Sequence, residues 1–487
     1  MEINYGEILL GVNEKYADEI LVETSVDTAE RGGAAKVLSL EAEAKAGAVE
    51  LLEGEAEVSG KVNYRLLYLD RQGRLCGLDY FKDFKSRVKG DAVTPTGRST
   101  VSFSVPDAEA RITGDEITLS AVVDVLVTYN GEVQKPSVVS AEGAETLTAE
   151  VVTERVERKE RTITVDKVAD VGLGIKKIVL FRADAMPVSV SEGKDGLTVS
   201  GEVKGTVLYM NDADEVVELT VSLPFSENAD GETTDFAVNV KSARVVLTDD
   251  EEGNVIEVEA TLLLTETICR ELTQNALAAV CDAKVTTEER TETVCATRFV
   301  ARKCYEEMLG GTLAAEEGEM VVSFVRPTCY AIAGVTVGEG EVKVEGVSAF
   351  RVVALRDGEY VSIPAELPFV YILPFAEAQE GMTADVNLYV TDAVASVRGK
   401  DLSISAKVRQ EVRLFEKRQC RYLSDVKDGA PISETTAGIS VYFAEKGEDL
   451  WSIAKSVGVL PSVLLKANPF LDEPLSENKK VLIFRQK

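Results

Sequence analysis

The sequence predicts a mainly β protein, with three tandem antiparallel β-rich, sandwich-like repeat domains followed by a small βααβ domain. Three observations carry this prediction. Apolar and polar residues alternate over most of the chain, one pattern occurs three times at domain-sized intervals, and about fifty residues at the C-terminal end change to helical spacing. The chain has 487 residues, too many for one ordinary core, and its 45% apolar content fits a folded protein.

The repeat is clearest around three glycines, Gly60, Gly201 and Gly346, which are separated by 141 and 145 residues. The copies align without gaps as VSGKVNYRLLYLD (58–70), VSGEVKGTVLYMN (199–211) and VEGVSAFRVVALR (344–356). An apolar cluster precedes each glycine, and a second alternating pattern follows each one. Intervals of this length are the size of a domain, so each copy is expected to fold around its own core.

Within a copy, the apolar residues recur at every second position, as in a strand with one buried face. In the first copy the residues expected to face one side are Val62, Tyr64, Leu66 and Tyr68, then Ile117, Leu119, Ala121, Val123, Val125 and Val127. Glycines within 70–74 and 356–360 predict hairpin turns between strands. We therefore expect antiparallel sheets and little helix within the repeats.

Two strongly charged segments, 149–167 and 283–303, connect the repeats. They are rich in Val and Thr, and their composition leaves two alternatives open: helices, or long bent strands that lead into the next repeat. The resulting domain boundaries are 1–148, 149–282 and 283–430 for the repeats and 437–487 for the terminal domain.

The tandem pattern resembles a repeated β-rich domain of spore-forming bacteria that is linked to spore coat proteins. The resemblance covers roughly residues 20–430. It rests on the V-x-G-x-V-x-x-x-x-L-Y core and the downstream L-P-F-S, which match best in the first two copies. The third copy lacks the Leu-Tyr pair.

The terminal segment predicts the order strand, helix, helix, strand, with strands at 439–443 and 481–484. Asp449 is expected to cap the first helix and Gly458 to end it. Pro461 suits the first turn of the second helix, and Asn468-Pro469 ends it. The residues expected to face inward are Leu450, Ile453, Ala454 and Val457 from the first helix and Val463, Leu464 and Leu465 from the second.

This segment resembles a LysM domain. The matching residues are Gly447, Leu450-Trp451, Ile453-Ala454, Gly458-Val459, Leu464-Leu465 and Ala467-Asn468-Pro469, with the closing strand. The resemblance implies a shallow groove for N-acetylglucosamine polymers, between the loop at 446–449 and the loop at 468–474.

Four departures from the LysM pattern surround this groove. Glu448-Asp449 replaces the usual Asp-Thr, Leu460 stands where a Ser or Thr cap is common, Phe470 replaces a polar residue, and Asn478-Lys479 replaces Gly-Gln. Asn478 tolerates the left-handed backbone that a glycine would supply. Leu460 and Phe470 are expected to be exposed, and exposed apolar groups favour protein contact; local packing remains an equal alternative for each. The candidate residues for a glycan groove or a partner surface are Gly447, Glu448, Asp449, Leu450, Trp451, Leu460, Asn468, Pro469 and Phe470.

The chain contains no histidine, which excludes Ser-His-Asp and Cys-His arrangements, His-ligated zinc and the H-E-x-x-H motif. No Gly-Lys pair belongs to a Walker A loop, and the Gly-Leu-Gly at 172–174 is expected to be a turn. The seven cysteines show no zinc-ligand spacing and are expected to be small buried hydrophobes or idle thiols. We expect no cofactor and no metal. A carboxylate pair for glycoside hydrolysis stays open, but no acidic residue is distinguished by its context.

The formal net charge is −30, which opposes binding to nucleic acid and to anionic lipid. The first twenty or so residues lack the basic and apolar regions of a signal peptide, and no apolar run approaches the ~18 residues of a membrane span. These features predict a cytosolic protein with no direct membrane insertion. The terminal domain carries seven basic and six acidic residues, a net +1 on a chain whose remainder is therefore −31.

Three β-rich repeats with a C-terminal LysM domain resemble the SipL-type spore morphogenetic proteins, the functional counterparts of the SpoVID proteins. The resemblance implies a non-enzymatic scaffold in the mother-cell cytosol that is recruited to the forespore surface. In that family the LysM domain contacts the coat-basal-layer morphogenetic ATPase. The alternative is a peptidoglycan-binding protein that the LysM domain anchors to cortex or wall, and a hydrolase with catalytic carboxylates in a β domain is a third class.

Overall fold

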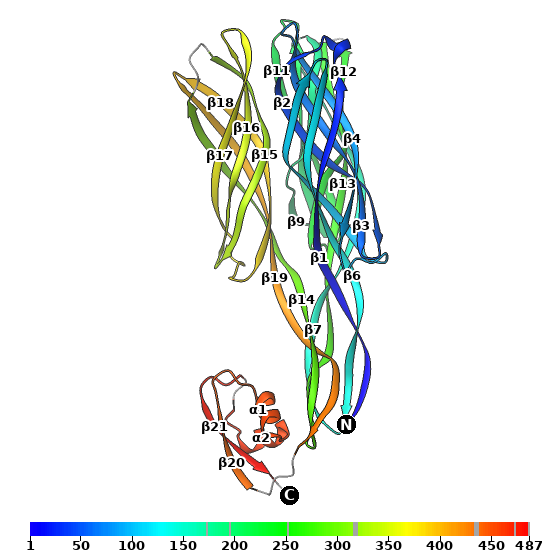
Figure 1. Ribbon diagram of the computed structural model, residues 1–487. Helices are drawn as coiled ribbons and strands as arrows, with labels where there is room; N and C mark the ends of the chain where they lie inside the picture. The colour runs from blue at the N-terminus through cyan, green and yellow to red at the C-terminus, as the bar shows by residue number, and fades with distance from the viewer. Residues whose placement is uncertain are drawn as a thin grey trace.

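Long antiparallel strands account for most of the computed structural model, which describes residues 1–171, 174–193, 196–250, 253–314, 320–432, 438–471 and 474–485 (Figure 1). The prediction of a mainly β fold made of several antiparallel sheets is confirmed. The described strands form six larger sheets, arranged as three pairs, and one small C-terminal sheet. Residues 172–173, where a turn was expected, lie outside the described residues.

The three sheet pairs share one strand order. Each pair has six long strands, counted here along the chain. The first, sixth and fifth lie side by side in one sheet, with the sixth at its centre, and the second, third and fourth form the other sheet. The first pair contains β1 (Glu2–Asp27), β2 (Ala34–Leu52), β3 (Glu55–Asp70), β4 (Leu75–Lys89), β5 (Arg98–Thr113) and β6 (Glu116–Glu142), with a 3-10 turn at Ala29–Arg31.

The second and third pairs repeat this order with different strand lengths. The second contains β7 (Glu145–Asp170), β8 (Ile175–Ala185), β10 (Gly196–Asn211), β11 (Val216–Ala229), β12 (Asp235–Asp250) and β13 (Gly253–Cys281), and the short β9 (Ser189–Gly193) also pairs with β10. The third contains β14 (Val285–Ala314), β15 (Met320–Gly338), β16 (Glu341–Arg356), β17 (Glu359–Pro374), β18 (Thr383–Arg398) and β19 (Asp401–Pro431).

Each pair encloses its own apolar core between the two sheets. In the first pair, the predicted inward residues of β3 and β6 all belong to this core, from Val62 to Tyr68 and from Ile117 to Val127. The hydroxyl of Tyr64 donates to the Val22 carbonyl at 2.7 Å, so the buried ring brings a satisfied polar group into the core. The hairpin turns predicted at Gly73 and Gly358 are also confirmed, with φ of 77° and 85°.

The repeated glycines lie on the central strands β3, β10 and β16, where each faces a phenylalanine on the next strand. Gly60 is paired with Phe84, Gly201 with Phe225 and Gly346 with Phe369. A Cβ at these glycines would approach the ring to 2.5, 2.7 and 2.5 Å respectively, which is too close for two carbon atoms. The ring therefore occupies the space of the missing side chain, and packing explains the glycine that defines the repeat.

The sheets β2-β3-β4, β11-β10-β8 and β15-β16-β17 meet at a common apolar cluster. Leu67, Leu208 and Val353 lie in it, separated by the same 141 and 145 residues as the glycines. Beside the cluster, the carboxylate of Glu41 lies 3.5 Å from a guanidinium nitrogen of Arg182 and 3.9 Å from one of Arg326. The three pairs thus contact one another through equivalent positions, and the buried Glu41 carboxylate lies between two arginine side chains.

The charged connecting segments form strands, which decides between the two alternatives that the sequence left open. They belong to β7 and β14, which pair along their lengths with β13 and β19. Together with β1 and β6, these strands continue below the sheet pairs as a narrow stalk (Figure 1). Apolar side chains from β6, β13 and β19, among them Val138, Val280 and Leu423, pack at the core of the stalk.

The C-terminal module lies beside the end of the stalk (Figure 1). It consists of β20 (Gly438–Ala444), α1 (Leu450–Val457), α2 (Pro461–Ala467) and β21 (Lys479–Arg485), and the two strands pair antiparallel. Among the described residues no single helix is long and apolar enough to cross a membrane; α1 and α2 pass only when taken together, across a bend of 104°.

Candidate functional site: the C-terminal module

The ends of both helices follow from the local sequence. The Asp449 carboxylate accepts a hydrogen bond from the Ser452 amide at 2.8 Å, which is the predicted N-cap of α1. Gly458 ends α1 in the left-handed region with φ of 68°, where a side chain would be strained. Pro461 occupies the first turn of α2, and Asn468 is the residue at its C-terminal end.

The inward face of α1 is confirmed, whereas that of α2 was only partly right. Leu450, Ile453 and Ala454 are buried, and Val457 packs against them. On α2 only Leu464 of the expected apolar set is buried, while Val463 and Leu465 are exposed. A seven-residue helix turns 100° per residue, so the neighbours of an inward side chain point away from the core.

Several predicted site residues hold the module together. The buried Asn468 side chain donates to the carbonyls of Leu464 at 2.9 Å and Leu482 at 2.7 Å, and its oxygen accepts from the Leu482 amide at 2.7 Å. It thereby fastens the end of α2 to β21. The Glu448 carboxylate accepts from the Tyr442 hydroxyl at 2.9 Å and from the Glu445 amide at 2.8 Å. These polar groups are engaged inside the module.

The loop before α1 is bonded to the segment that leads into β21. The Gly447 amide donates to the Leu475 carbonyl at 2.9 Å, and the Leu475 amide donates to the Glu448 carbonyl at 3.0 Å. Asn478 does not adopt the left-handed conformation considered for it, since Asp214 and Asp357 are the only non-glycine residues with positive φ among those described. Its side chain instead accepts from the Lys446 amide at 2.7 Å. Residues 472–473 of the expected groove lie outside the described residues.

The remaining predicted site residues differ in exposure. Phe470 is exposed as expected, and Pro469 beside it is exposed too. Trp451 is partly buried, and Leu460, which was expected to be exposed, is also partly buried; it is the N-cap residue of α2. Of the nine candidates, the apolar side chains that keep surface for a partner are therefore those of Trp451, Leu460, Pro469 and Phe470; Glu448 and Asp449 are also partly exposed.

The module contacts the stalk through its helices and the turn between them. The ammonium of Lys455 on α1 lies 2.6 Å from the Glu289 carboxylate of β14. The Ser462 amide at the start of α2 donates to the Glu145 carboxylate at 2.9 Å, and the Cys281 thiol lies 3.6 Å from the Val459 carbonyl. The small sheet lies on the opposite side of the helices (Figure 1).

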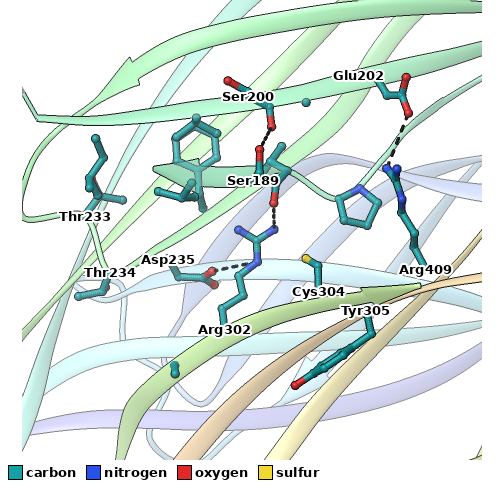
Figure 2. A pocket seen from close by; sticks show the side chains of 18 of the residues that line it. Ser189, Ser200, Glu202, Thr233, Thr234, Asp235, Arg302, Cys304, Tyr305 and Arg409 are labelled. Atoms are coloured by element: carbon teal, nitrogen blue, oxygen red, sulfur yellow. Dashed lines mark hydrogen bonds and ion pairs between the residues drawn. The ribbon is translucent and has the colours of Figure 1, made fainter. Parts of the chain in front are cut away.

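A separate cavity of about 970 Å³ lies between the second and third sheet pairs. Figure 2 shows its lining, which combines hydroxyls such as those of Ser189 and Ser200 with the charged groups of Glu202, Arg302 and Arg409. Sequence reasoning missed this cavity, because its residues come from β9, β10, β11, β12, β14 and β19 and have no local motif in common.

The charged groups of the cavity pair with one another. Arg302 bonds to Glu411 and lies 4.0 Å from Asp235, and Arg413 donates to Asp235 at 2.8 Å. Arg409 lies 3.7 Å from Glu202, on the opposite wall (Figure 2). Desolvation by the surrounding protein raises the pKa of the Cys304 thiol, which disfavours the nucleophilic thiolate form. The arrangement links the second and third sheet pairs electrostatically.

Cysteines can form disulfide bonds, and clusters of cysteines and acidic residues can bind metal ions. All seven thiols are free, and Cys281 is buried. Among the residues that the structure describes, no group of three or more His, Cys, Asp or Glu side chains could hold a metal ion.

Comparison of the chain with family models, with curated proteins and with solved structures found no match.

Proposed function

We propose that the chain is a non-enzymatic scaffold of spore-envelope assembly that docks to a protein partner through its C-terminal module. In this proposal the module is a LysM-type domain, and each sheet pair is one of three tandem domains. The proposed domain boundaries at 148/149 and 282/283 lie close to the short connections between sheet pairs. These connections run from Glu142 to Glu145 and from Cys281 to Val285.

The observation that carries the proposal is the distribution of exposed apolar side chains. The described part of the chain has 24 large hydrophobic residues that are exposed, and eight of them lie between Ile439 and Phe484. This concentration, on about a tenth of the chain, favours a contact surface. Asn468 and Glu448, which the LysM resemblance places by the glycan groove, are occupied with bonds inside the module, and this favours a protein over a sugar.

The resemblance to SipL-type proteins supplies the partner class, a coat-basal-layer morphogenetic ATPase at the forespore surface. The chain would act in the mother-cell cytosol, and its sheet pairs would support localisation and coat encasement. The net charge of −30 supports this assignment because it keeps copies of the body apart and leaves the nearly neutral module free to dock.

The test compares two ligands, the purified coat ATPase and insoluble peptidoglycan, each with the full chain and with a chain ending at residue 431. The proposal expects ATPase binding that the truncation abolishes and no retention on peptidoglycan. Strong retention on peptidoglycan with no ATPase binding would replace the scaffold by a glycan-anchored protein. Release of muropeptides by the full chain would instead indicate a hydrolase.

Trp451→Ala gives a finer test of the module. We expect this variant to bind the ATPase more weakly, and circular dichroism of the full chain shows whether the loss reflects unfolding. Normal binding by a folded variant would place the contact surface away from α1.

A further inference from the structure

The outer face of the small C-terminal sheet is apolar and uncovered. On β20 and β21, one set of alternating side chains, including Ala444, Val481 and Ile483, packs against the helices. The other set points away from them, and we call it the outer sheet face: Ile439, Val441, Phe443, Lys480, Leu482 and Phe484. The exposed fractions of its five apolar side chains are 68% for Ile439, 46% for Val441, 69% for Phe443, 38% for Leu482 and 40% for Phe484. A strand that alternates in this way normally presents polar residues outward.

The strand register makes the outer sheet face continuous. Ile439 is directly opposite Phe484, Val441 is opposite Leu482, and Phe443 is opposite Lys480. Side chains in directly opposed positions have Cβ atoms ~5 Å apart, so these three pairs touch across the sheet. The result is a single apolar strip along both strands, with Val441 and Leu482 at its centre.

In the part of the chain that the structure describes, the apolar residues of this face stay exposed beside the stalk. Among the described residues, the hydrogen bonds and ion pairs between the module and the stalk involve Lys455, Val459 and Ser462, which belong to the helices and the turn between them. The module therefore has two layers, a helical layer that faces the stalk and a sheet whose other side is open. A sheet with two apolar faces is stable when a further layer covers the second face.

The dimensions of the face suit a helix. Seven residues per strand give a length of ~23 Å, at about 3.3 Å per residue. A helix of about 15 residues has this length, and its width of ~10 Å covers two strands that are ~5 Å apart. A helix with one apolar stripe can therefore cover the strip and leave its polar side in water.

The charges on the face select an acidic partner. Lys480 is its one charged residue, and the ammonium lies over the Phe443 ring at 5.6 Å from the centroid. No acidic side chain belongs to the face, so a partner carboxylate near Lys480 gains an ion pair without facing repulsion. A second copy of the chain would bring another thirty net negative charges against the whole body, and an anionic lipid surface would repel the body in the same way. A short acidic helix instead places a few carboxylates against the module alone, which carries a net +1.

We propose that the outer sheet face binds an acidic amphipathic helix of another protein, with the apolar stripe of that helix over Val441 and Leu482 and a carboxylate against Lys480. This inference rests on the proposed docking role of the module and adds the surface and the partner chemistry.

The probe is a fluorescein-labelled helical peptide of about 16 residues with a leucine stripe and glutamates on its flanks, titrated with the full chain and followed by anisotropy. A scrambled peptide of the same composition is the peptide control. The face variant is Val441→Ser/Leu482→Ser, and the matched protein control is Val370→Ser/Ile372→Ser, which removes two exposed apolar residues from β17. Both variants must keep the wild-type melting curve and Trp451 fluorescence.

We expect saturable binding of the helical peptide, weakened about tenfold or more by the face variant and unchanged by the β17 variant. Lys480→Glu should weaken it severalfold, and added salt should do the same to the wild type. Absence of binding, or equal binding by the face variant, overturns the proposal. Reversible self-association of the wild type that the face variant abolishes overturns it in favour of a second copy.

The same proteins separate this inference from the proposed function. If the coat ATPase binds the wild type and the face variant equally, the scaffold role stands and the outer sheet face is the wrong surface. If the acidic peptide binds as expected but the ATPase does not bind, the surface stands and the assigned partner is wrong.

Discussion

In β3 of the first sheet pair, Val62, Tyr64, Leu66 and Tyr68 alternate along the strand and are enclosed between two sheets. In β20 of the C-terminal module, Ile439, Val441 and Phe443 alternate in the same way and face outward. The two strands have the same period, but a second sheet covers the first set, and none of the described elements covers the second. The comparison teaches that alternation identifies a strand and its two faces, whereas burial depends on what packs against each face.

The comparison predicts a large difference between two leucine substitutions. Leu66→Ala removes a fully buried side chain from the core of the first sheet pair and should cost about 2–5 kcal/mol of unfolding free energy. Leu482→Ala on the outer sheet face should change it by less than about 0.5 kcal/mol. Guanidinium titrations followed by circular dichroism measure both. Similar losses would mean that the outer sheet face is covered in solution.

Glycine substitutions sharpen the explanation of the repeat. Gly201→Ala forces a Cβ against the Phe225 ring and the Val188 side chain and should cost about 1–3 kcal/mol. Gly310→Ala in β14 is the control, because the nearest atom to its added Cβ is 3.7 Å away. We expect this control to be neutral or slightly stabilising in the same titrations. A neutral Gly201→Ala would show that the glycine is not required for packing.

The cap of α1 tests whether the module unfolds independently of the body. Asp449→Ala removes the acceptor of the Ser452 amide and should destabilise α1 by about 1 kcal/mol. The fluorescence of Trp451, the single tryptophan, should report a lower midpoint for the module. The β-sheet signal of the body should keep its midpoint, and Asp449→Asn should restore most of the loss. A joint shift of both signals would mean that module and body unfold together.

The stalk should show a pH dependence that comes from Glu154 on β7. Burial raises the pKa of Glu154 on β7 from 4.5 to about 7, although Arg298 and Arg418 nearby oppose the shift. The folded chain then holds this proton more tightly than the unfolded chain, so its contribution to stability is present below pH 4.5 and is lost as the pH rises through about 7.

Glu154→Gln should remove this loss because glutamine does not titrate. The free energy of unfolding of the variant minus that of the wild type should therefore be larger at pH 8 than at pH 5. Urea midpoints at the two pH values measure the effect. Substitution of the exposed Glu7 by glutamine is the control. An unchanged pH dependence in Glu154→Gln would assign the titration to another group.

Local patterns determined much of the molecule. The period of two in β3 and β6, the glycine turns at Gly73 and Gly358, and the caps at Asp449 and Gly458 were all predicted, because each depends on residues that are close in sequence. Two further features depend on residues that are distant in sequence and close in space. The charged segments of β7 and β14 are strands because long partners, β13 and β19, are there to pair with them. Asn468 is a structural clamp because β21 lies beside it.

The sequence by itself determined the strands, the threefold repeat and the order of elements in the C-terminal module, since periodicity and turn chemistry are properties of adjacent residues. Only the tertiary structure decided that Leu67, Leu208 and Val353 share one cluster, that Gly60 accommodates the Phe84 ring, and that the β20–β21 sheet presents an apolar face to solvent. These are contacts, or missing contacts, between segments far apart in the chain, and the burial of a side chain is set by the elements that reach it in space.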